Sequence, residues 1–436
     1  MKKGLEFEEM MKLVGEALTE IPEHRKGKNK QYEIKDAGLG AFSVFYFQTP
    51  SFLSWQQAME KKRGKNNARN LFGIKRIPSD EQIKNLLDPV EEKSVGKVVW
   101  QIYHALDDRG QLQAYKGVGG TRMISLDGTQ HHSSQKVHCE QCRVTIRDGK
   151  AYYEHQVLMA VLSGPEQKHV ICLEPEFITP QDGHDKQDCE QAAIKRWVQA
   201  HAKEFMPWSV TILTDDLHCH QPACELFNKH QMYFILTCKE ASHTTLYEEL
   251  TLLERVEGAI DTKTVRKWNG RHYEQWVYRW AASLPLRRGE DAMLVNWCEL
   301  TVINESTGTR MFYSGWATNH EINEHTVTNI AAAGRSRWKV ENEGINVLKN
   351  HGYNFKHNYG HGKQHLANVL LNLLLLAFLF HTVLHLGSEM YQAVRRDLGA
   401  RRNFFNDLRA LTRYILFDSW QQLLLYMYQG LELEPD

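Results

Sequence analysis

The chain has 436 residues with 53 basic and 53 acidic side chains, so its formal net charge is zero. An apolar fraction of 42% and a charged fraction of 24% are typical of a globular protein and exclude a disordered chain. Zero net charge also excludes a general attraction to nucleic acid, so DNA binding would require a local basic surface. This length predicts two or three packed units.

The first 118 residues predict a mostly helical region. Apolar residues recur at helical spacing in 7–18 and 95–106, and Ser79 with Gln82 forms a capping box before a third helix. Between these helices the basic, asparagine-rich segment 61–70 predicts a loop that faces solvent or phosphate. Its candidate DNA-binding residues are Lys61, Lys62 and Arg63.

From residue 119 the pattern changes to strands. Short apolar or alternating runs, separated by turn residues, predict strands at 123–126, 136–138, 144–146, 154–162 and 169–173. A helix at 188–203 and a strand at 209–213 follow. This order of a strand meander, a helix and a further strand is what a ribonuclease-H-like core requires.

A long segment separates two candidate acidic residues, Asp215 and Glu341, which lie 126 positions apart. Its alternating runs predict an all-β insertion over 246–325, which divides the core into 119–245 and 326–390. Helices are expected again in 391–436. The predicted fold is therefore α/β, a mixed-sheet core with a β insertion, flanked by helical N- and C-terminal regions.

The cysteine usage and the longest apolar segment bear on the compartment. Eight cysteines and an N-terminus without a secretory signal indicate a reducing cytoplasm. The apolar segment 366–386 contains Asn368, Asn372, His381 and His385, each of which is costly in lipid. It predicts a helix buried between other helices, with a membrane anchor as the alternative.

Three acidic residues are the candidate catalytic groups. Asp127 and Asp215 each end an apolar run, and Glu341 lies in the amphipathic, helical segment 335–349. Three carboxylates supply the hard oxygen ligands that two Mg²⁺ ions about 3.5–4 Å apart need for phosphoryl transfer, and Mn²⁺ can substitute. Asp127 is expected to bridge the ions from a strand end, where Gly128 permits a sharp turn.

These contexts resemble the D-D-E catalytic cores of bacterial insertion-sequence transposases, which have a ribonuclease-H-like core with a β insertion. The glutamate helix of that family reads Tyr, two residues, Arg, three residues, Glu, six residues, Lys. Arg337 and Glu341 keep the spacing. Gly334 stands at the tyrosine position and Leu348 at the lysine position, with Lys349 one residue later.

The resemblance implies Mg²⁺-dependent cleavage at transposon ends and strand transfer into target DNA. Asp127, Asp215 and Glu341 would hold the metal, and Arg337 and Lys349 would contact the phosphates of the transposon end. The implied partners are the terminal inverted repeats, target DNA and a second copy of the chain in a synaptic homodimer, in the bacterial cytoplasm at the nucleoid. The alternatives are a nuclease of the same fold and a DNA-binding or zinc-stabilised scaffold with a decayed triad.

Two neighbouring acids compete with the chosen ones. Asp216 follows Asp215, and the family pattern favours the first because a small and then an apolar residue follow the acid. Glu343 lies about 200° from Glu341 on a helix of ~3.6 residues per turn, so the two cannot share a face.

A Cys-x-x-Cys pair, Cys139 and Cys142, has the spacing of one edge of a tetrahedral zinc site. Two more ligands are needed for a structural zinc, and Cys189, His184 and His138 are the candidates. Two ordinary thiols in a reducing cell are the alternative.

Histidines also lie close in sequence to two of the acids. His131 and His132 follow Asp127, and His357 and His361 follow the glutamate helix. His357 or His361 is a candidate phosphate contact or proton shuttle, with an ordinary loop histidine as the alternative.

Overall fold

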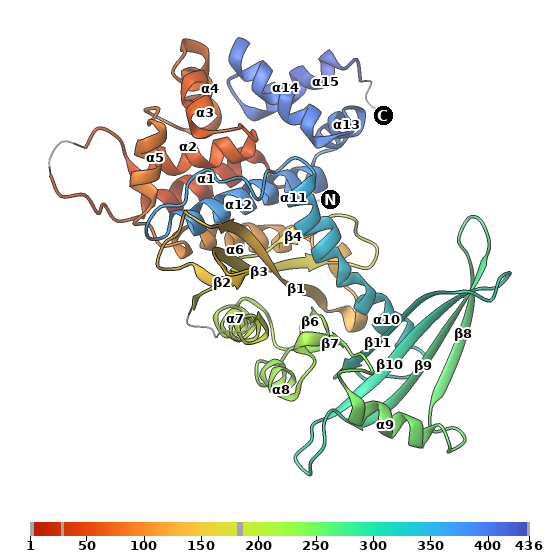
Figure 1. Ribbon diagram of the computed structural model, residues 1–436. Helices are drawn as coiled ribbons and strands as arrows, with labels where there is room; N and C mark the ends of the chain where they lie inside the picture. Colours follow the sequence, from red (N-terminus) through yellow and green to blue (C-terminus); the bar gives the residue numbers. More distant parts are fainter. Residues whose placement is uncertain (1–3, 28–29, 181–185, 434–436) are drawn as a thin grey trace.

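The computed structural model describes residues 4–27, 30–180 and 186–433. All strands in these residues belong to one mixed sheet (Figure 1). They are β1 (Arg122–Ser134), β2 (Arg143–Arg147), β3 (Lys150–Ser163), β4 (Ile171–Cys172), β5 (Glu176–Ile178), β6 (Val210–Thr214), β7 (Tyr233–Thr237), β8 (Asp261–Trp268), β9 (Tyr273–Pro285), β10 (Leu294–Asn304) and β11 (Arg310–Thr318). Their order is β2-β3-β1-β6-β7-β11-β10-β9-β8, with β4 and β5 paired to β3.

Helices precede the strands in the chain, lie between them and follow them. Those before β1 are α1 (Phe7–Thr19), α2 (Ile34–Tyr46), α3 (Phe52–Met59), α4 (Lys62–Phe72), α5 (Asp80–Leu87) and α6 (Lys93–Asp108). Those between strands are α7 (Lys186–His201), α8 (Gln221–Lys229) and α9 (Thr244–Leu253). Those after β11 are α10 (Val327–Ser336), the π-helical turn η6 (Val340–Ile345), α11 (Asn346–Asn350), α12 (Leu366–Gly387), α13 (Glu389–Asp397), α14 (Arg401–Tyr414) and α15 (Trp420–Gly430).

The strand β1 lies in the interior of the sheet, between β3 and β6. It pairs antiparallel with β3 and parallel with β6, and β6 pairs parallel with β7. Residues 123–126 of β1 are all buried, as expected for a strand covered on both faces. In Figure 1, α7 and α8 lie on one side of these strands and α11 and α12 on the other. The expected mixed α/β class is therefore confirmed.

The long apolar helix α12 lies inside the protein. It is the one helix of the described residues that is long and apolar enough to cross a membrane, and 89% of its most apolar window is buried. Its polar residues have partners: His381 Nε2 lies 3.0 Å from the Tyr46 carbonyl, and Asn372 donates to the Glu92 carbonyl at 3.0 Å. The expectation of a helix buried between other helices is confirmed.

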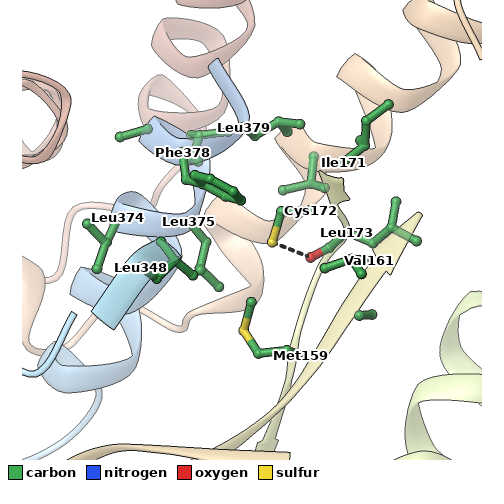
Figure 2. Packing of buried hydrophobic residues seen from close by; sticks show 14 of the residues in the cluster. Met159, Val161, Ile171, Cys172, Leu173, Leu348, Leu374, Leu375, Phe378 and Leu379 are labelled. Atoms are coloured by element: carbon green, nitrogen blue, oxygen red, sulfur yellow. Dashed lines mark hydrogen bonds between the residues drawn. The ribbon is translucent and has the colours of Figure 1, made fainter. Parts of the chain in front are cut away.

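The apolar core joins α12 to the sheet. Figure 2 shows side chains from α12, from β3 and β4 and from the end of the glutamate helix in one cluster. Its labelled members include Met159, Val161, Ile171, Leu348, Leu374, Leu375 and Phe378. This packing fixes the helix that carries Glu341 against the central strands.

The loop expected at 61–70 is wrong, because these residues form most of α4. The polar composition hides an amphipathic helix that buries Ala68, Leu71 and Phe72. The buried Asn67 donates to the carbonyls of Thr412 and Ile415, both at 2.7 Å. These contacts lie more than 340 positions away, so no local pattern could indicate them.

Two strand expectations also need correction. Residues 136–138 form no strand and lie in the turn between β1 and β2. Asp127 does not end its strand, because β1 continues to Ser134 and pairs with β3 along that length. Gly128 therefore makes no sharp turn.

The expectation of an all-β insertion over 246–325 is wrong at its start, where most of α9 lies, and the strands that follow extend the core sheet. Strand β11 pairs antiparallel with β7, so β8 to β11 continue the sheet that contains β1 (Figure 1). Without the insertion, β7 would be an edge strand of the core sheet. An uncovered strand edge can pair with a further strand, and β11 pairs with β7 there.

Replacing Asn67 by alanine is expected to lower the free energy of unfolding by about 1–3 kcal/mol. The change removes both donations and the acceptance of the Phe417 N–H at 2.9 Å, and leaves buried backbone groups unsatisfied. Urea denaturation measures the effect, with the half-exposed neighbour Asn66→Ala as the control. Equal losses in the two variants would contradict this role for Asn67.

Candidate active site

Asp127 lies partly buried on β1 among other carboxylates. Burial raises its pKa from 3.8 to about 7, and the negative charge of Glu341 is the next cause. Arg337 acts in the opposite direction, while Asp215 and Glu190 raise the pKa further. The fold therefore brings Asp215 and Glu341 into electrostatic range of Asp127.

The strand register explains why Asp215 approaches Asp127. The last parallel pair between β1 and β6 is Ser125 with Leu213. Asp127 and Asp215 each lie two residues beyond that pair, on neighbouring strands that run in the same direction. Side chains two residues apart share a face of a sheet, so both carboxylates follow from one register.

Asp215 and its neighbour Asp216 have different surroundings. The side chain of Asp215 is 40% exposed and accepts the Leu217 N–H at 3.1 Å. Asp216 accepts the Lys239 N–H at 2.7 Å and the Ser242 hydroxyl at 2.5 Å. Asp216 thus fixes the segment after β7, and Asp215 is the acid with a solvent-facing carboxylate beside Asp127.

Arg337 holds Glu341 from one turn earlier. Its Nη1 donates to Glu341 Oε1 at 2.8 Å, and its side chain is 9% exposed against 40% for Glu341. The Arg337 Nε is buried and has no hydrogen-bond partner among the described residues. Arg337 is thus a nearly buried cation that pairs with the more exposed carboxylate of Glu341.

Glu343 points to a different part of the protein. It lines a cavity with Lys168, His169, His385 and Arg395. Among the charges that shift the pKa of Asp127, that of Glu341 has the largest effect, and Glu343 is not one of them. The two acids therefore separate as their helical spacing indicated.

The π-helical turn brings Lys349 to the site in place of Leu348. A π turn contains one residue more than an α turn, so it moves every later residue one position along the helix face. Leu348 is fully buried in the core (Figure 2), and Lys349 Nζ donates to Thr129 Oγ1 of β1 at 2.6 Å. Thr129 shares a strand face with Asp127. The π turn thus explains why Lys349, and not residue 348, reaches β1.

Gly334 also has a structural reason. A Cβ at this position would lie 2.5 Å from the indole nitrogen of Trp316, which is buried on β11. A tyrosine does not fit there, because α10 packs directly against that ring.

Glu190 is an acid of the site that the sequence did not reveal. It is buried on α7, and its Oε1 fills the space where a Cβ of Gly128 would lie, at 2.3 Å. His218 Nε2 lies 3.8 Å from Glu190 Oε2 and 3.8 Å from Asp215 Oδ1. Only the contact with a strand glycine distinguishes Glu190 from other helix acids, and that contact requires the fold.

The donor set of the site fits a divalent cation. Asp127, Asp215 and Glu341 supply carboxylate oxygens, the ligands that Mg²⁺ prefers. Burial raises the pKa of Asp127, the charge of Glu341 raises it further, and a bound cation would stabilise the ionised carboxylates.

The remaining candidate residues lie elsewhere. Lys61 and Lys62 are exposed at the start of α4, and Arg63 donates to the Tyr414 carbonyl. The sulfur atoms of Cys139 and Cys142 are 3.9 Å apart. His184 and the side chain of Cys189 lie outside the described residues.

Comparisons with known proteins give little. No protein-family model and no curated protein matches the chain. Among solved structures, the chain is similar to one titled "Cryo-EM structure of piggyBac transposase synaptic complex with hairpin DNA". The identity is 10% over 99% of this chain and 83% of that chain, with a TM-score of 0.37. The chemistry of this chain therefore has to be argued from its side chains.

Asp127→Asn is expected to stabilise the protein increasingly as the pH rises from about 4 to about 7. Because the folded state keeps a proton that the unfolded state has lost over this range, wild-type stability falls with rising pH. Each pKa unit corresponds to ~1.4 kcal/mol, so the gain reaches a few kcal/mol. Thermal melts of both proteins in EDTA at pH 4, 5.5, 7 and 8 measure it. A melting-temperature difference that does not change between pH 4 and 7 would contradict the placement of Asp127.

Proposed function

We propose that the chain is a DNA transposase that uses divalent metal to cleave DNA at transposon ends and to join them to target DNA. The observation that carries the proposal is the approach of Asp215 and Glu341 to Asp127. The three acids come from the central strand, from the end of its parallel neighbour and from a helix packed across the sheet. Phosphodiester chemistry needs such a set of oxygen ligands on a rigid frame.

The order of the strands supports a ribonuclease-H-like core. Antiparallel pairing links β1 to β3 and β3 to β4 and β5, and parallel pairing links β1 to β6 and β6 to β7. Helix α7 lies between the two groups in the chain. The Arg337 and Glu341 spacing adds the resemblance to insertion-sequence transposases.

Asp127, Asp215 and Glu341 are the residues that would hold Mg²⁺, or Mn²⁺ in its place. The bound metal supplies activation of water or a 3′-hydroxyl and stabilisation of the leaving oxyanion. Arg337 keeps the carboxylate of Glu341 in position through its 2.8 Å contact. Asp127 must be deprotonated to act as a ligand, so its raised pKa makes activity increase with pH towards neutrality.

Lys349 and Arg337 are proposed to contact the scissile region of the DNA backbone. Both are cations near the three acids. Lys349 donates a hydrogen bond to Thr129 on β1. Burial lowers the pKa of Lys349, the nearby Lys356 adds to this, and the charge of Asp127 opposes it. A phosphate between the two lysines would remove their mutual repulsion.

The start of α4 is proposed as a second DNA contact. Lys61, Lys62 and Lys65 are exposed there, and none of them has a carboxylate partner among the described residues. Cations at a helix N-terminus are unfavourable for the helix itself, since the dipole is positive at that end. Their presence is better explained by an anionic partner such as the DNA backbone. Synapsis of two transposon ends would require a homodimer at the bacterial nucleoid.

Asp127→Asn and Glu341→Gln are each expected to reduce metal-dependent nicking of supercoiled plasmid by at least about 10²-fold, because each removes a metal ligand. Gel analysis of nicked product with Mg²⁺, Mn²⁺ or EDTA measures this. Glu343→Gln is the matched control on the same helix and should keep wild-type activity.

The same assay separates the proposal from its alternatives. A decayed scaffold gives no metal-dependent nicking with the wild-type chain. A nuclease of the same fold nicks DNA but does not join pre-cleaved ends to a target plasmid. End fragments for this second assay would be taken from the DNA that flanks the coding region, where the proposal expects inverted repeats.

Lys349→Gln is expected to weaken DNA binding and to reduce the slope of log affinity against log salt by about 1, since one phosphate contact is lost. Fluorescence anisotropy at several salt concentrations measures both quantities. Lys12→Gln, an exposed lysine paired with Glu16 on α1, is the control. An unchanged slope in Lys349→Gln would exclude a phosphate contact by this residue.

A further inference from the structure

Four soft or nitrogen donors converge at one point away from the acidic site. Cys139 and Cys142 lie in the turn between β1 and β2, His155 lies on β3, and His361 lies between α11 and α12. One ligand atom of each lies within 4.8 Å of the others. Two neighbouring segments and a third one more than 200 positions further along the chain thus contribute to a single cluster.

The spacing of the donors is that of a tetrahedron around zinc. With Zn–S of ~2.3 Å and Zn–N of ~2.0–2.1 Å, tetrahedral geometry requires edges of about 3.8 Å between sulfurs, 3.6 Å between sulfur and nitrogen and 3.3 Å between nitrogens. The sulfurs of Cys139 and Cys142 are 3.9 Å apart, and the two Nε2 atoms of His155 and His361 are 3.1 Å apart. The sulfur–nitrogen distances are 3.4 Å for Cys139 with His155 and 3.3 Å for Cys142 with His361.

We propose that Cys139, Cys142, His155 and His361 bind one structural zinc ion. All four positions of a tetrahedral ion are filled by protein, which is typical of structural sites and leaves no open position for a substrate. Two thiolates balance the charge of the ion, so the complex can be buried at low cost.

The surrounding hydrogen bonds favour metal binding. The Cys139 N–H donates to Cys142 Sγ at 3.4 Å, which stabilises that sulfur as a thiolate. His361 Nδ1 lies 3.1 Å from the Gly362 carbonyl, so its protonated nitrogen is Nδ1 and Nε2 is free to bind metal. Cys142, His155 and His361 are 5%, 3% and 6% exposed, which protects such a site from water.

This ligand set differs from the one expected from the sequence. His138, although adjacent to Cys139, stacks on Tyr153 at 4.4 Å and lies 3.2 Å from the Lys136 carbonyl through Nδ1. His361, a candidate proton shuttle in the sequence, points to Cys142. His155 and His361 therefore complete the cluster of the described residues, and His138 does not belong to it.

The ion would connect the glutamate helix to the sheet. His155 and His361 are 206 positions apart, and His361 lies in the segment 351–365 that follows α11 directly. A cross-link between such distant residues restricts the unfolded chain and stabilises the fold. Zinc would thereby fix the chain on the C-terminal side of Lys349 against β3.

The test is the zinc content of the full chain expressed in zinc-supplemented medium, measured by inductively coupled plasma mass spectrometry. Cys139→Ser, His155→Ala and His361→Ala are each expected to lose one zinc per chain relative to wild type. His138→Ala is the matched control and should keep it. Wild-type protein without zinc, or ligand variants with the wild-type content, would overturn the proposal.

A measurement on the unmutated chain covers the case of unfolded variants. Exchange of zinc for Co²⁺ should give the visible absorption of a tetrahedral ion with two thiolates, and a strong chelator should lower the melting temperature by several degrees. Absorption of an octahedral Co²⁺ ion, or an unchanged melting temperature, would count against the site. Neither readout involves DNA cleavage, so it is independent of the proposed transposase activity.

Discussion

The burial of the Asp127 carboxyl within electrostatic range of other acids is the constraint on which the site depends. Isolated in water, these acids would separate. Here β1, β6 and the glutamate helix are fixed by strand pairing and by the apolar packing under α12, so the acids stay together. The folding energy of the core thus offsets local repulsion, as is common where a protein preorganises charge for a ligand. The pKa of Asp127 is raised first by burial of its carboxyl and next by the charge of Glu341.

The π-helical turn solves a problem of register in the glutamate helix. Glu341 must face β1 while Leu348 fills the core between α12 and the sheet. In a regular α-helix, residues seven apart lie on nearly the same face, so Glu341 and Leu348 would compete for it. The additional residue in the turn directs Leu348 inwards and places Lys349 over Thr129. That Lys349 and not Leu348 reaches β1 is therefore a consequence of helix geometry.

Local patterns predicted some parts of the fold and not others. The position of Asp215 followed from the strand before it, and Ser79 accepts the Gln82 N–H as its capping motif indicated. The full length of β1 did not follow, because its second half is polar and is held by pairing with β3. Helix α4 was not predicted because its composition is polar and the residues that Asn67 contacts lie near the other end of the chain. Glu190 and the two histidines of the metal cluster depend on packing between segments, which spacing in the sequence does not record.

The β insertion has a structural role in positioning the glutamate helix. Its strand β11 pairs with β7 and carries Trp316, whose ring lies where any side chain at Gly334 would be. Helix α10 therefore takes its position from the insertion, and Arg337 and Glu341 follow directly from α10. Because β7 pairs with β6, the same strands that place Asp215 also support β11. Strand pairing from β6 through β7 to β11 and the packing of α10 on Trp316 thus connect the element that places Asp215 with the element that carries Arg337 and Glu341.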